Sequence, residues 1–168
     1  MKAKKFIVLL LLFYFAIAGI SNLLQAQDIS KYQALFMSKF IDYVQWPDGK
    51  ENLVVGIVGN SRVLIELQKT VAQKNKATVK KISSAADAAT CDMIFLPSDQ
   101  DKLFSTILSG TEGKSVLIIA EGEELAKKGS VISFYVDQGK LKFYINKLAA
   151  SSRGLQISRS LMSLAKII

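Results

Sequence analysis

The fold is decided by the stretch Tyr32-Gln33-Ala34-Leu35-Phe36-Met37-Ser38-Lys39-Phe40-Ile41-Asp42-Tyr43-Val44-Gln45-Trp46-Pro47. On a helix of about 3.6 residues per turn, four aromatic side chains share one face. They are Tyr32, Phe36, Phe40 and Tyr43, and Met37, Ile41 and Val44 flank them, opposite a polar strip of Ser38, Asp42 and Gln45. We therefore predict a largely buried helix that reaches Trp46, because Pro47 disfavours helical geometry in the residue before it. The first strand of an α/β core should follow.

An apolar leader precedes this helix. Lys2, Lys4 and Lys5 come before an apolar run at residues 6–20, and small or polar residues lead to Ala26. A basic start, an apolar centre and a small-residue exit are typical of a secretory signal peptide, so we expect cleavage after Ala26. The alternative is a retained membrane anchor, although the run is shorter than the roughly 20 residues of a spanning helix.

Composition predicts one exported domain at residues 28–168. The chain has 168 residues, half of them hydrophobic, which suits a single ordinary core. Loss of the leader removes three lysines and lowers the formal charge from +8 to +5, a modest excess that does not indicate nucleic-acid binding. Cys91 is the only cysteine, so folding cannot rest on an internal disulfide.

The central part of the chain alternates between two patterns. Continuous apolar runs predict strands at residues 53–58, 78–82, 93–96 and 115–120. Between them, helices are expected at residues 61–73, 83–90 and 98–108, with Asn60 or Ser61 capping the first and Ser98 capping the last. This alternation predicts an α/β fold with a mostly parallel, Rossmann-like or flavodoxin-like sheet flanked by helices.

A C-terminal hairpin is predicted at residues 131–146. Two alternating segments are separated by a turn, and a two-residue loop of Gln138 and Gly139 puts all apolar pairs on one face. The expected pairs are Asp137 with Lys140, Val136 with Leu141, Phe134 with Phe143, and Ile132 with Ile145.

The remaining C-terminal residues predict three short elements. Asn146 can cap a helix at residues 147–152, and Gly154 can end it in the left-handed conformation. Residues 155–157 should be extended. Ser158 can then cap a last helix with an apolar face of Leu161, Leu164, Ala165 and Ile168.

Catalytic chemistry is poorly represented. The absence of histidine excludes histidine-based triads and the commonest metal ligand, and we predict no cofactor and no metal. Cys91 precedes a buried strand and is interpreted as an inert core thiol. Glu121, Glu123 and Glu124 follow the fourth strand, where a charged first helical turn is favoured over a catalytic carboxylate pair. We therefore predict that the protein is not an enzyme.

One strand-to-helix turn is a candidate ligand site. The segment at residues 56–61 places glycine where backbone N–H groups could hold an anion, at the carboxyl edge of the sheet. It lacks the lysine of a phosphate loop and the third glycine of a dinucleotide fingerprint. The candidate ligand-binding residues are Gly59, Asn60, Ser61 and Ser98.

Five sequence blocks together resemble the YfiR-like (DUF4154) family of periplasmic proteins. They span about residues 30–167 in the family's order. They are the aromatic helix ending in Trp46-Pro47, Cys91-Asp92-Met93-Ile94-Phe95-Leu96, Gly129-Ser130-Val131-Ile132-Ser133-Phe134, Gly139-Lys140-Leu141-Lys142-Phe143-Tyr144-Ile145-Asn146, and Gly154-Leu155-Gln156-Ile157-Ser158 with Leu161 and Leu164.

The resemblance implies a regulatory role in the periplasm. Founding members bind the sensory portion of an inner-membrane diguanylate cyclase and hold it inactive, so that release raises cyclic di-GMP and promotes biofilm formation. Other family domains are sensory modules of histidine kinases. The founding members carry disulfides, whereas Cys91 alone rules out an intramolecular disulfide switch here.

The leading hypothesis is therefore a periplasmic protein that binds, and inhibits, a membrane-anchored signalling protein. Candidate contact residues are Phe36, Phe40, Tyr43, Trp46, Tyr144 and Arg153, to the extent that the core leaves them exposed. A second copy of the chain is a further candidate partner. The alternatives are a small-ligand-binding module at the carboxyl edge of the sheet and a cryptic enzyme using Cys91 or a carboxylate pair.

Overall fold

The computed structural model describes residues 29–72 and 76–168. The expected leader, its cleavage site and Gln73 at the predicted end of a helix lie outside the described residues. Among the described residues, no helix is long and apolar enough to cross a membrane.

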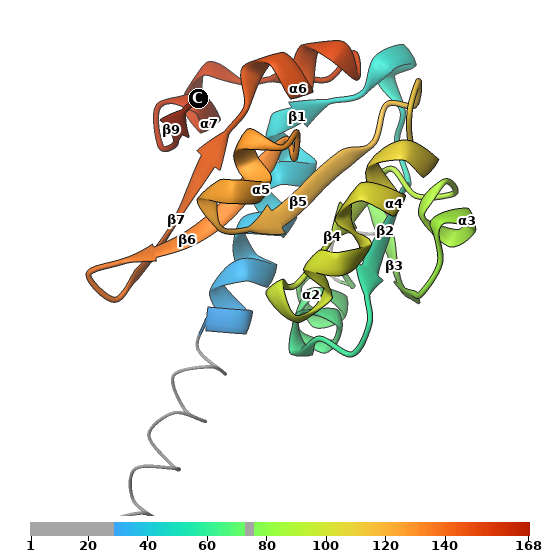
Figure 1. Cartoon of the computed structure of the whole chain (residues 1–168), viewed down its shortest axis with the longest axis horizontal. Helices are drawn as coiled ribbons and strands as arrows, with labels where there is room; N and C mark the ends of the chain where they lie inside the picture. Colours follow the sequence, from blue (N-terminus) through green and yellow to red (C-terminus); the bar gives the residue numbers. More distant parts are fainter. Residues whose placement is uncertain (1–28, 73–75) are drawn as a thin grey trace, which may run out of the picture.

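A mostly parallel sheet forms the centre of the molecule (Figure 1). Its seven strands in the described chain have the spatial order β3-β2-β4-β5-β6-β7-β9, and only β6 and β7 pair antiparallel. The strands are β2 (Leu53–Val58), β3 (Ala77–Ile82), β4 (Met93–Phe95), β5 (Leu117–Glu121), β6 (Ile132–Asp137), β7 (Lys140–Ile145) and β9 (Lys166–Ile167). The predicted α/β fold class is confirmed.

Helices cover both faces of this sheet. The helix at residues 29–43, here called the N-terminal helix, shares one apolar core with α2 (Arg62–Val71). A second core on the other face includes residues of α3 (Ala85–Ala88), α4 (Phe104–Gly110) and α5 (Glu123–Lys127). The remaining elements are β1 (Val44–Gln45), η1 (Pro47–Gly49), η2 (Ser98–Leu103), α6 (Lys147–Ser152), β8 (Gln156–Ile157) and α7 (Arg159–Met162).

The N-terminal helix is buried as predicted, but on a rotated face. Ala34, Met37 and Phe40 are fully buried, and Ser38, which was assigned to the polar strip, is also buried. The predicted aromatic face is split, because Tyr32 is 56% exposed and Tyr43 is 43% exposed. The helix face that packs against the sheet therefore lies between the predicted aromatic face and the predicted polar strip.

The same helix ends three residues earlier than predicted. It stops at Tyr43, and Val44 and Gln45 form β1, which pairs antiparallel with Ile157 and Gln156 of β8. Trp46 is extended, at φ −84° and ψ 151°, as its position before a proline requires. Pairing with β8 carries this extended conformation back through Val44, whose branched side chain favours a strand.

The C-terminal hairpin has the predicted register. Ile132 lies opposite Ile145, Phe134 opposite Phe143, and Asp137 opposite Lys140. Gln138 and Gly139 both have positive φ, at 49° and 74°, as a tight two-residue hairpin loop requires. The tip of this hairpin extends beyond the rest of the sheet (Figure 1).

Two predicted helices differ from the structure. Ser158 caps α7 as expected, but α7 has a single turn, and Lys166–Ile167 then form β9 beside β7. This strand covers an otherwise open sheet edge, and Ile168 donates its N–H to the Ile145 carbonyl at 3.0 Å. Ser98 does not cap a helix, because it begins η2 and its N–H donates to Glu121 Oε2 at 2.7 Å.

Candidate functional site at the amino edge of the sheet

Trp46 is anchored where the parallel strands begin. β1 and the extended Trp46 direct the indole toward the start of β4, and its Nε1–H donates to the Asp92 carbonyl at 3.2 Å. The residue is 7% exposed, so the ring packs into the core while its one polar group is satisfied. The following proline thus fixes the backbone conformation of Trp46, and the hydrogen bond to Asp92 fixes its indole ring.

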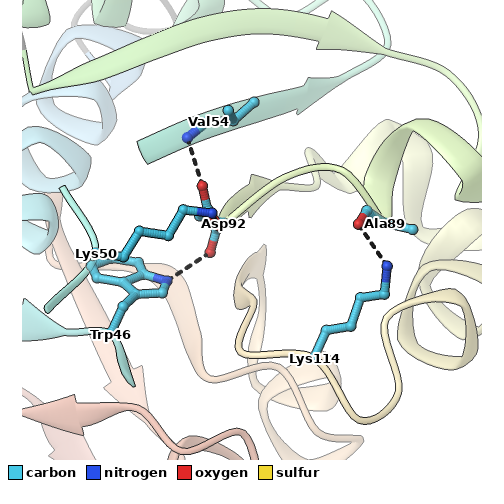
Figure 2. A network of polar contacts seen from close by, with 6 residues as sticks. All are labelled: Trp46, Lys50, Val54, Ala89, Asp92 and Lys114. Atoms are coloured by element: carbon cyan, nitrogen blue, oxygen red, sulfur yellow. Dashed lines mark hydrogen bonds and ion pairs between the residues drawn. The ribbon is translucent and has the colours of Figure 1, made fainter. Parts of the chain in front are cut away.

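Asp92 ties three strands together at this edge. Its carboxylate accepts the Val54 N–H of β2 at 2.9 Å and the Lys50 ammonium at 2.7 Å. The Asp92 carbonyl also accepts the Leu117 N–H of β5 at 2.8 Å. Figure 2 shows Trp46, Lys50 and Val54 converging on this residue. Asp92 is 8% exposed, so these bonds replace the water that its charge would otherwise require.

The segment that follows α6, with Arg153 and Gly154, lies at the same edge of the sheet. Arg153 Nη1 donates to the Thr111 carbonyl at 3.1 Å and to the Lys114 carbonyl at 3.4 Å. Gly154 has φ 68°, and a Cβ placed there would lie 3.3 Å from Cγ of Pro47. Partial burial lowers the pKa of Arg153 from its usual value. These contacts hold the residues after α6 against the segment that follows Trp46.

Two grooves flank Trp46 and Lys50, each with a volume of about 490 Å³. The first, here called the Lys114 groove, lies between Trp46-Pro47 and the starts of β4 and β5; its further lining residues are Lys50, Ala89, Thr90, Cys91, Asp92, Lys114, Ser115 and Val116. The second, the Lys76 groove, is lined by Ile41, Val44, Gln45, Gly49, Glu51, Asn52, Leu53 and Lys76 in addition to Trp46 and Lys50. Trp46 and Lys50 therefore line both grooves.

The structure brings together only some of the predicted contact residues. Trp46 and Arg153 border the Lys114 groove, directly or through Lys114, and Tyr43 lies three residues before Trp46 and remains accessible. Phe40 and Tyr144 are buried elsewhere, and Phe36 is half-buried against Phe143, with ring centroids 5.4 Å apart. The core therefore takes up most of the predicted aromatic surface and leaves Tyr43 as its accessible part.

The predicted ligand residues at the carboxyl edge already have partners within the chain. The Gly59 N–H donates to the Ile82 carbonyl at 3.1 Å, and Asn60 Oδ1 accepts from Lys81 Nζ at 2.6 Å. Ser61 Oγ caps α2 by accepting the Val63 N–H at 3.2 Å. With the Ser98 N–H bonded to Glu121, these four residues stabilise local structure, and a ligand there would have to compete with those bonds.

The acidic residues at and after the end of β5 bind separate partners. Glu121 accepts from the Gln33 side chain and from the Ser98 N–H, and so links the N-terminal helix to η2. Hydrogen bonds from Lys127 and Lys128 lower the pKa values of Glu123 and Glu124, which keeps both carboxylates ionised. The geometry is that of a charged first helical turn with i,i+4 partners. The described residues contain no group of three potential metal ligands.

Cys91 is a buried thiol packed against β2. A Cβ at Gly56 would lie only 2.7 Å from Cys91 Sγ, so glycine at that position accommodates the sulfur. Burial raises the pKa of Cys91 above its usual value and so reduces the thiolate fraction.

We expect native Cys91 to react with Ellman's reagent at least about tenfold more slowly than free cysteine at pH 8, because both burial and a raised pKa reduce attack by the thiolate. Reaction of the chain unfolded in guanidinium is the control and should proceed at the rate of a free thiol. Equal rates in the native and unfolded chain would show that Cys91 is accessible.

Lys50, Asp92 and Lys114 are the site residues that sequence reasoning missed. Asp92 was noted only as part of the block at residues 91–96, although an acidic residue directly before a fully apolar strand is itself a signal of a buried, paired charge. Lys50 and Lys114 lie in loops with no local pattern. Their proximity depends on the order of β2, β4 and β5 in the sheet.

The sheet order, the two helical layers and the terminal hairpin define a doubly wound α/β protein whose amino edge carries an anchored tryptophan and two grooves. The sequence model of the YfiR/HmsC-like family (DUF4154) matches residues 30–166, and the chain therefore belongs to this family. Membership is consistent with a periplasmic regulatory protein. Three of the sequence blocks quoted in the sequence analysis, around Trp46, Asp92 and Gly154, meet at the amino edge described above.

Solved structures agree with the fold. A conserved domain protein from Vibrio cholerae O1 biovar El Tor aligns with a TM-score of 0.56 and 15% identity, over 82% of this chain and 59% of that one. An ABC domain from Streptococcus pneumonia in complex with L-Trp aligns with a TM-score of 0.56 and 16% identity, over 83% of this chain and 60% of that one. The chain spans about three fifths of the length of these two structures, and at such identities the likeness concerns the fold alone. No curated protein sequence matches this chain significantly.

Proposed function

We propose that the protein is a periplasmic regulator that binds the periplasmic part of a membrane-anchored signalling protein, a diguanylate cyclase or a histidine kinase, and holds it inactive. The observation that carries this proposal is the family match over residues 30–166. The apolar leader is in keeping with export. Asp92 at one sheet edge and Glu121 and Glu123 at the other are bonded within the chain, which favours a binding protein over an enzyme.

The contact surface is proposed at the amino edge, around Tyr43, Trp46 and Arg153. Tyr43 is 43% exposed at the end of the N-terminal helix, and its carbonyl accepts the Ser158 N–H at 3.0 Å. Its backbone is thus fixed while its ring is free to contact a partner. Rigid, accessible tyrosines are frequent anchors in protein interfaces.

Site-specific photo-crosslinking in the native host tests this proposal. With Tyr43→p-benzoylphenylalanine, we expect a crosslink to an inner-membrane protein that carries a cyclase or kinase output domain. The matched control is Tyr32→p-benzoylphenylalanine, because Tyr32 is at least as accessible as Tyr43 but lies at the other end of the same helix. Crosslinking at neither position would argue against the proposed function, and crosslinking at Tyr32 alone would place the interface elsewhere.

Tyr43→Ala should weaken partner binding about tenfold, since a truncated interface anchor typically costs more than 1 kcal/mol. The free energy of unfolding should change by less than about 0.5 kcal/mol, because the ring is largely outside the core. Deleting the gene should raise cyclic di-GMP or kinase output, and Tyr43→Ala should complement the deletion only in part. Full complementation, with unchanged affinity, would exclude Tyr43 from the interface.

A small-ligand-binding module is the second candidate. Each amino-edge groove, at about 490 Å³, lies within the size range of small-molecule sites. A ligand of the native chain should raise Tm in proportion to the logarithm of its concentration. Screening periplasmic amino acids, sugars and carboxylates by thermal shift tests this function, and no shift with any of them would count against it.

A further inference from the structure

The outer edge of β7 is only partly occupied. β9 pairs with Tyr144 and Ile145, the last two residues of β7, and closes the sheet on this side (Figure 1). Ile168 donates its N–H to the Ile145 carbonyl at 3.0 Å, so the backbone groups of Ile145 point outward. Because strand residues alternate, those of Leu141 and Phe143 point outward as well. No strand within the described ranges pairs with these two residues on that side, and the first part of β7 is therefore an open strand edge.

The strand β9 is held by few contacts. Its two residues, Lys166 and Ile167, are both exposed, and Leu164, which precedes them, is 70% exposed. Lys166 lies opposite Tyr144, with Nζ 5.3 Å from the centroid of the ring. Ile167 lies opposite Ile145. A terminal strand that buries so little apolar surface is among the elements that open most easily.

A second copy of β7 would place the same kinds of side chain on this edge. When the β7 strands of two copies pair antiparallel about a two-fold axis at Phe143, Lys142 of the second copy lies opposite Tyr144. Leu141 of the second copy lies opposite Ile145. A lysine therefore faces the tyrosine and an aliphatic side chain faces the isoleucine, as they do when β9 is bound. This register joins the outward N–H and C=O groups of both strands and puts no two lysines directly opposite each other.

The other outermost strand, β3, does not offer an equally open edge. The Leu53 N–H donates to the Lys76 carbonyl, so that Lys76 faces β2 and, by alternation, Val79 faces outward. The Val79 carbonyl accepts a hydrogen bond from Gln68 Nε2 at 3.2 Å, which uses the central acceptor of this edge. Self-pairing is therefore favoured at β7 over β3.

We propose that β9 is an autoinhibitory strand, which prevents β7 from pairing with β7 of a second copy of this chain. β9 and the second β7 need the same position beside Tyr144 and Ile145, so only one of them can be bound. Release of β9 then converts a monomer into a two-fold dimer that is joined through β7. The inference is independent of the signalling partner proposed above, whose contact surface is at the amino edge.

Size-exclusion chromatography with light scattering, on chains exported and processed by the host, tests the inference. At equal protein concentration, we expect the full chain to be a monomer and a chain truncated after Leu164, which lacks β9, to be a dimer. Ile168→Pro keeps every residue and removes only the N–H that bonds to the Ile145 carbonyl. It should lower the dimer dissociation constant at least about tenfold, because both copies must release β9.

Two proline variants of the truncated chain show which edge is used. Leu141→Pro removes an outward N–H of β7 and should restore the monomer. Val79→Pro is the matched control, because it removes an outward N–H of β3, and it should leave the dimer intact. Circular dichroism verifies that each variant is folded. Three results would overturn the inference: a dimeric full chain, monomers of both the truncated chain and Ile168→Pro, or a dimer that survives Leu141→Pro.

Discussion

Replacing Phe40 with alanine is expected to lower the free energy of unfolding by about 3–5 kcal/mol, because the deleted ring leaves a cavity at the centre of the larger core. Phe40 is fully buried, and its ring centroid lies 5.3 Å from that of Phe143 and 5.9 Å from that of Phe134. It joins the N-terminal helix to both strands of the hairpin. Urea denaturation of the purified chain measures the loss, which corresponds to a decrease in Tm of about 10–15 °C.

Two further variants keep this prediction testable if Phe40→Ala does not fold. Phe40→Leu retains most of the volume and should cost only about 1 kcal/mol. Tyr32→Ala removes a larger side chain from the same helix, but Tyr32 is 56% exposed, so the change should stay within about 0.5 kcal/mol. Equal effects of Phe40→Leu and Tyr32→Ala would show that the aromatic cluster does not carry the predicted stability.

The hairpin was predictable residue by residue because its determinants are local. The alternation of apolar and polar side chains admits one register, and Gln138-Gly139 accepts the positive φ of the loop. The strands β2, β4 and β5 were predictable for a similar reason, since continuous apolar runs of that length are typical of buried parallel strands.

The short strands were not predictable because their pairing is non-local. Residues 158–168 carry a serine cap and an apolar stripe that fit a helix, yet the sheet edge at β7 takes Lys166–Ile167 as a strand. Val44 likewise belongs to a helical pattern, and its pairing with Ile157 overrides that preference. In both cases hydrogen bonds to a distant segment outweigh a weak local propensity.

The candidate site was predictable in part. Trp46 and Arg153 were named from the sequence, but helical spacing could not determine which aromatic rings the core would bury. Asp92 and Lys50 are 42 positions apart, and only the adjacency of β2 and β4 brings them together. Charges that meet through sheet order leave no periodic pattern in the sequence.

Asp92 makes two kinds of contact whose contributions can be separated. Its bond to Lys50 involves an ammonium that is half-exposed, and such partly solvated ion pairs contribute at most about 1 kcal/mol. Its bond to the Val54 N–H lies at the start of a buried strand, where a donor without an acceptor costs about 1–3 kcal/mol. The backbone bond should therefore be the larger of the two.

Asp92→Ala is expected to lower the free energy of unfolding by about 2–3 kcal/mol, because it removes both contacts and leaves the Val54 N–H without its acceptor. Asp92→Asn keeps an oxygen for that N–H and should cost about 1 kcal/mol, whereas Lys50→Ala should cost less than about 1 kcal/mol. Urea denaturation of the three variants measures their free energies of unfolding and so ranks the three losses. If Lys50→Ala were as destabilising as Asp92→Ala, the ion pair rather than the strand contact would hold the amino edge together.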